Sequence, residues 1–118
     1  MVKEPSYILI SNFILEQLKE DRRFRNVHYV ARYEFLKNQR DDKYVNMILK
    51  KCNKSFDEVK KDSQIFIRDI RRLVIKELKR LDYLKCMNLL NNTSELDKFL
   101  THINETIERK YNNDFFLR

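Results

Sequence analysis

Apolar side chains recur at spacings of three and four residues along most of the chain, which is the spacing of one face of an α-helix. The first such segment starts at Pro5 and ends at the charged stretch 19–23, with Ile10 and Ile14 on one face. Proline suits the first turn of a helix because its missing N–H would have no partner there. Other apolar residues, Ile8 among them, spread around the circumference, so this helix is expected to be buried on two sides.

Two shorter amphipathic segments follow. Asn26 can cap a helix over 27–38, because a short polar side chain accepts a hydrogen bond from the free N–H groups of the first turn. Asp41 or Asp42 can cap the next helix in the same way, and Asn53 is suited to end it because asparagine tolerates the left-handed conformation. Both segments are predicted to be helices of about three turns.

The clearest local signal marks the start of a long helix. Ser55 and Glu58 have the spacing of a capping box, in which Ser55 accepts from the third-residue N–H and Glu58 reaches back to the cap N–H. From Val59 to Leu84 the apolar residues stay on one side for about 26 residues, when each residue turns the helix by about 100°. We therefore predict one amphipathic helix from Phe56 to about Leu84. The sequence leaves open a break at 62–63 or 82, because these residues can also cap helices.

Residues 91–94 carry the strongest turn chemistry in the chain, with two asparagines followed by threonine and serine. A last helix is predicted after this turn, with Ser94 as its cap and apolar residues at spacings of three and four. A short β-hairpin over 106–118, turning at 112–114, is the alternative for the end of the chain, although a lone hairpin is marginal in water.

Together the segments predict an all-α fold, a single helical domain over 1–118 built as a compact bundle of about five helices around the long one. Composition supports this class, since the chain has no Gly and one Pro in 118 residues. A β-sandwich or small barrel needs such residues in its tight turns. The missing glycines also exclude Gly-rich phosphate loops, dinucleotide-binding fingerprints and the nucleophile elbow of common hydrolases.

Charge adds a functional hypothesis. The formal net charge is +7, and residues 22–85 hold 19 basic against 9 acidic side chains. A basic excess of this kind favours acidic partners, with nucleic acid first among them. Several basic residues fall on the polar side of the long helix, opposite its apolar stripe, and others cluster after the first helix. The residues expected to bind nucleic acid are Arg22, Arg23, Arg25, Arg32, Lys61, Arg68, Arg72, Lys76 and Lys79.

The leading interpretation is a non-catalytic protein whose basic helical face binds DNA, RNA or another polyanion by releasing counterions from it. Aromatic residues among the arginines, Tyr29 and Tyr33, can stack on unpaired bases or be half-buried in the core. A basic face is also what an ordinary solvated helix carries. The alternative is a helical adaptor or homodimer that uses surplus apolar surface, such as Ile8 or residues 115–117, on a protein partner.

Catalytic chemistry has little support. His28 and His102 are the only histidines and lie in no metal-binding spacing, and a set of Cys52, His28 and Asp41 has nothing that brings it together. We expect no enzyme activity, no metal and no cofactor. Two cysteines 34 residues apart predict free thiols, and the first residues resemble neither a secretory signal nor a membrane span. The sequence thus favours an intracellular protein, cytoplasmic or nuclear and not secreted.

Overall fold

The described part of the chain folds into helices joined by short turns, and it contains no strand. The structure, a computed structural model, describes residues 6–26 and 29–111. These residues form α1 (Tyr7–Lys19), α2 (Arg22–Arg25), α3 (Tyr29–Asn38), α4 (Asp42–Cys52), α5 (Phe56–Leu78), α6 (Tyr83–Asn91) and α7 (Thr93–Tyr111). The all-α class is confirmed, with seven helices in these residues in place of the five expected.

The extra helices arise where the predicted long helix ends early and where the charged stretch after α1 forms a helix of its own. α5 begins at Phe56 behind the complete capping box of Ser55 and Glu58, as predicted. It ends at Leu78, so the prediction of a helix continuing to about Leu84 is wrong. Asp82 caps α6 instead, its carboxylate accepting from a backbone N–H 2.8 Å away. The turn folds α6 back so that its buried Cys86 donates to the carbonyl of Leu78.

Local capping explains most of the other helix ends. Ser6 caps α1, which begins at Tyr7, two residues after the expected Pro5. Asn53 ends α4 in the left-handed conformation, with φ of 54°, as predicted. Asn26 ends α2, and the residues between it and α3 lie outside the described part.

The last helix begins two residues earlier than predicted, at Thr93. The side chain of Asn92 accepts from the backbone N–H of Glu95 at 3.1 Å, so Asn92 is the capping residue and Ser94 lies inside α7. α7 continues to Tyr111, which makes the alternative β-hairpin wrong for 106–111. The rest of that segment, 112–118, lies outside the described residues.

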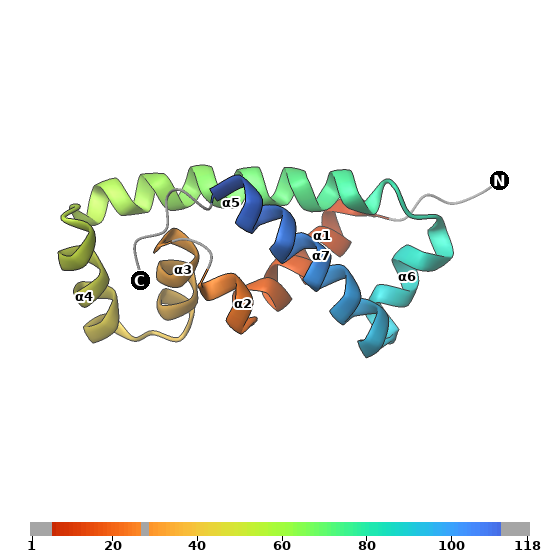
Figure 1. Ribbon diagram of the computed structural model, residues 1–118, viewed down its shortest axis with the longest axis horizontal. Coiled ribbons are helices and arrows are strands. Elements are labelled where there is room, and N and C mark those ends of the chain that lie inside the picture. The colour runs from red at the N-terminus through yellow and green to blue at the C-terminus, as the bar shows by residue number, and fades with distance from the viewer. Residues whose placement is uncertain (1–5, 27–28, 112–118) are drawn as a thin grey trace.

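α5 runs along the length of a molecule that measures 53 × 22 × 21 Å (Figure 1). α1 packs along it, α4 lies at its start and α6 follows its end. α7 runs diagonally below α5 and packs against α6, α1 and α5. No helix in residues 6–26 and 29–111 combines the length and the apolar character needed to cross a membrane.

Two apolar clusters hold these helices together. The larger one contains Ile14, Leu18 and Phe24 and extends through α5, α6 and α7. The smaller one joins α3 and α4 to the first turns of α5, around Tyr33 and Val59. α5 contributes to both clusters and therefore acts as the spine of the fold. α1 is buried over much of its circumference from its second turn onward, but its first turn leaves Ile8 65% and Leu9 68% exposed, contrary to expectation.

Candidate nucleic-acid interface

A line of basic side chains follows the solvent side of α5. Val59, Phe66, Ile70, Val74 and Leu78 turn inward and are buried. The opposite side presents Lys61, Arg68, Arg72, Lys76 and, directly after the helix, Lys79, all exposed. We call these five residues the basic ridge. At about 1.5 Å per residue the ridge is about 27 Å long, and the helix that carries it is anchored in both apolar clusters.

Few acidic groups offset the ridge. Its one ion pair within the described residues joins Arg68 Nε to the neighbouring Asp69 at 4.0 Å, the outer limit for such a contact. Lys79 Nζ lies 5.8 Å from the centre of the Tyr7 ring. The largely buried carboxylate of Glu77 is turned to the other side of α5, where it contacts Arg80 at 3.5 Å and His102 at 3.0 Å. The ridge therefore keeps most of its positive charge facing solvent.

The structure extends this basic surface with residues that the sequence reasoning missed. Lys60 and Arg71 are exposed on α5. Turning the helix by about 100° per residue places them within about 20° of each other, so the same periodicity would have found them. With Arg68 they line one wall of a groove of 360 Å³. Lys19 of α1 and Lys37 of α3 line the groove too, and no helical period could connect these residues to α5.

A buried carboxylate lies among the lysines of this groove. Glu34 is 5% exposed, and its oxygens lie 3.9 Å from Lys19 Nζ and 3.5 Å from Lys37 Nζ. The buried hydroxyl of Ser63 donates a hydrogen bond to the same carboxylate. Burying a carboxylate is costly unless it is paired and hydrogen-bonded. Glu34 therefore holds both lysines against the groove, and they in turn offset its charge.

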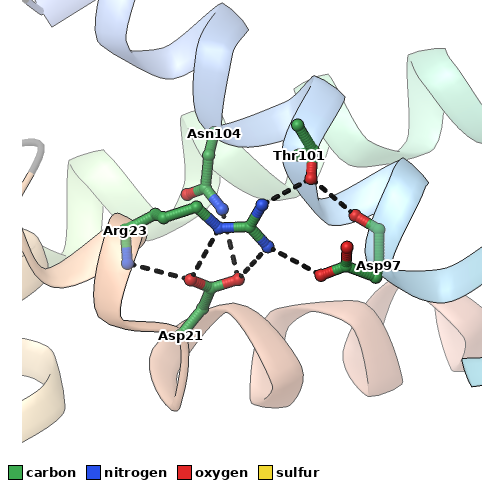
Figure 2. A network of polar contacts seen from close by, with 5 residues as sticks. All are labelled: Asp21, Arg23, Asp97, Thr101 and Asn104. Atoms are coloured by element: carbon green, nitrogen blue, oxygen red, sulfur yellow. Dashed lines mark hydrogen bonds and ion pairs between the residues drawn. The ribbon is translucent and has the colours of Figure 1, made fainter. Parts of the chain in front are cut away.

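The other predicted basic residues, the cluster of Arg22, Arg23, Arg25 and Arg32, do not form one line of exposed charges like the basic ridge. Arg23 is engaged in a polar network (Figure 2). Its guanidinium donates to both carboxylate oxygens of Asp21, at 3.1 and 2.8 Å, and to Asp97 of α7 at 3.2 Å. Thr101 accepts a further hydrogen bond from it. Asn104 donates to Asp21 at 3.3 Å. Arg23 thus joins α2 to α7, and its charge is balanced within the molecule.

This network shifts the pKa of both charged partners. Burial raises the pKa of the Asp21 carboxyl, but hydrogen bonds from the side chain and backbone of Arg23, its charge and the Asn104 amide outweigh burial, and the pKa is lowered. The pKa of Arg23 is raised, chiefly by its hydrogen bond to Asp21. Both groups are therefore ionised at neutral pH. The Oδ1 atom of Asn104 is buried and has no hydrogen-bond partner among the described residues.

The remaining arginines of this cluster are spread over α2 and α3. Arg22 is exposed, Arg32 is half-buried, and the guanidinium of Arg25 packs 4.1 Å above the ring of Phe35. Tyr33 is buried, so the expectation that its ring can stack on bases is wrong. The side chain of Tyr29 lies outside the described part. No residue of this cluster lines the groove beside α5.

The structure describes only some of the groups considered for catalysis. His102 contacts Glu77, and His28 lies outside the described residues. Within residues 6–26 and 29–111, no group of three or more His, Cys, Asp and Glu side chains is placed to hold a metal ion. Cys52 and Cys86 are free, and burial raises the pKa of both thiols, which makes them poor nucleophiles. Comparison with protein-family models, curated proteins and solved structures finds no match for this chain.

Proposed function

We propose that this protein is a non-catalytic binding protein that attaches to nucleic acid through the basic ridge of α5. One observation supports the proposal: the five exposed cations of the basic ridge follow one side of α5 and the residue after it, with a single ion pair, at 4.0 Å, among them in the described residues. Cations held in such a line replace the counterions condensed on a phosphate backbone, and the released ions drive binding. The proposal no longer relies on Arg23, because that side chain is engaged in the network between α2 and α7.

Binding of this kind depends strongly on salt and weakly on base sequence. If each of the five ridge residues neutralises one phosphate of a DNA duplex, the logarithm of the binding constant falls with the logarithm of salt concentration with a slope of about −4.5. Ridge cations would contact phosphates and so position the protein without reading base edges. Duplexes of different sequence are therefore expected to bind with similar affinity.

The direct test reverses two charges at the centre of the ridge. Arg68→Glu combined with Arg72→Glu is expected to weaken binding to a labelled DNA duplex by about 30-fold at moderate salt, because two phosphate contacts become repulsive. The salt slope should become less negative by about two. Fluorescence anisotropy over a series of salt concentrations measures both quantities.

A matched control makes the same change of net charge elsewhere. Lys43 and Lys98 are exposed on α4 and α7, away from α5 in sequence and outside the groove. Lys43→Glu combined with Lys98→Glu should reduce affinity by no more than about threefold, through long-range charge alone. Equal losses in the two double variants would show that net charge, and not the ridge, causes binding. A wild-type protein that does not bind either DNA or RNA would contradict the proposal.

A second candidate function is self-association through apolar helix surface. Leu9 on α1 and Leu84 on α6 are 68% and 72% exposed, and the two helices pack against each other. Contiguous apolar surface left in solvent often marks a protein interface. A homodimer would have twice the mass of the 14.6 kDa chain in sedimentation equilibrium, and Leu9→Ser with Leu84→Ser should return it to the single-chain mass. A wild-type mass that stays at one chain at high protein concentration would contradict this candidate.

A further inference from the structure

The groove where α1, α3 and α5 meet differs from the ridge in shape. The ridge is a convex line of side chains, whereas the groove has a volume of 360 Å³ and walls contributed by three helices. Five basic side chains line it, namely Lys19, Lys37, Lys60, Arg68 and Arg71. The one acidic side chain in its lining is Glu34, and Gln64 adds an amide that can donate hydrogen bonds. A ligand in the groove would therefore be surrounded by donors on several sides.

The charges of the groove fall into two sets. Lys19 and Lys37 are paired with Glu34, and Lys19 also lies 3.7 Å from the exposed Glu16. Lys60 and Arg71 have no ion pair with any residue that the structure describes, and they are both exposed. Arg68 has its marginal contact with Asp69, which does not line the groove. Uncompensated positive charge is thus concentrated on the α5 wall of the groove.

We propose that this groove is a binding site for a phosphate group. The guanidinium groups of Arg68 and Arg71 can hold phosphate oxygens in pairs, and Lys60 adds a compact charge beside them. The buried carboxylate of Glu34 repels an anion from the side of the groove on which it lies, so the phosphate sits against the α5 wall. Lys19 and Lys37 stay paired with Glu34 and offset its charge, so Lys60, Arg68 and Arg71 provide the main contacts to the phosphate.

The phosphate can belong to a nucleic-acid backbone or to a small phosphorylated molecule, since the recognising chemistry is the same. Arg68 belongs to both the ridge and the groove, so a backbone bound along the ridge can place one phosphate in the groove. A nucleic-acid backbone as the source rests on the proposed function, whereas the phosphate site itself does not. The phosphate site and nucleic-acid binding can therefore be refuted separately.

Inorganic pyrophosphate is a suitable probe because it presents phosphate oxygens without a base or sugar. We expect a titration followed by NMR of backbone amides, at constant ionic strength, to saturate and to shift signals of α1, α3 and α5 around the groove. Lys60→Gln combined with Arg71→Gln should weaken this binding by at least about tenfold, from the loss of two charge-assisted contacts. Lys43→Gln combined with Lys98→Gln, with the same change in net charge, should stay within about twofold.

Three outcomes would overturn the site. Shifts that never saturate, shifts spread over all basic surfaces, or equal weakening in the two double variants each indicate nonspecific attraction to a basic protein. Displacement of a bound DNA duplex by pyrophosphate, together with weaker duplex binding by the Lys60 and Arg71 variant, would identify the backbone as the source. Saturable pyrophosphate binding that leaves duplex binding unchanged would identify a small phosphorylated ligand. Saturable binding in a protein that binds no nucleic acid would refute the proposed function alone.

Discussion

Replacing Phe24 by alanine is expected to lower the free energy of unfolding by about 3–5 kcal/mol, the range for removing a buried phenylalanine. Phe24 is fully buried, and its ring centre lies 6.0 Å from that of Phe66 in α5. It is also the single buried residue of α2, a helix of four residues. A helix this short has no stability of its own, so the side chain of Phe24 is the main apolar anchor of α2.

Urea denaturation followed by circular dichroism measures this loss, and Phe56→Ala is its matched control. Phe56 is 53% exposed at the start of α5, so removing its ring should change stability by no more than about 0.5 kcal/mol. Domains of this kind are stable by only about 5–15 kcal/mol, so the Phe24 variant should unfold at clearly lower urea concentration. Equal effects of the two substitutions would mean that α2 is not anchored in the core as described.

Replacing Asp21 by alanine is expected to cost about 3 kcal/mol at neutral pH, because it removes a helix cap and leaves Arg23 with weaker partners. Asp21 accepts from the backbone N–H of Arg23 at 2.9 Å and from its guanidinium through both oxygens. Asp97→Ala is the matched control, because Asp97 is largely exposed and makes one contact with Arg23 at 3.2 Å. A surface ion pair of that kind contributes about 1 kcal/mol or less.

The Asp21 contribution should also depend on pH in a defined direction. Its pKa is lowered in the folded protein, so between the folded and unfolded values the unfolded chain binds more protons. The stabilisation is therefore complete above the unfolded pKa of about 3.9 and is lost as the pH falls through the folded value. Unfolding measured from pH 6 to pH 2 should show the difference between wild type and Asp21→Ala shrinking in acid. A difference that stays constant over this range would contradict the role assigned to the carboxylate.

The start of α5, the end of α4 and the buried face of α5 were predictable from sequence because the interactions that decide them are local. The capping box from Ser55 to Glu58 spans four residues, and the left-handed Asn53 needs no distant partner. That Arg68 and Arg72 lie on the solvent side of α5 follows from the apolar stripe on the other side of the same helix. Each of these features can be found in a short window of the chain.

The tertiary structure decided which of several equally good local options was used. Asp82 could cap a new helix or lie within a longer one, and in the structure it caps α6, whose buried Cys86 donates to the Leu78 carbonyl at the end of α5. Arg23 and Arg68 both lie in basic stretches of the sequence. Arg23 contacts Asp97 and Thr101, more than 70 residues away, whereas Arg68 faces solvent.

Composition and periodicity by themselves determined an all-helical chain with one strongly amphipathic, basic helix. Only the tertiary structure brought Lys19, Lys37 and Arg71 to one groove around Glu34. The physical reason is the sequence distance over which the deciding interactions act. Caps and helical faces depend on hydrogen bonds and spacings within a few residues, whereas a groove between three helices depends on how the whole core packs.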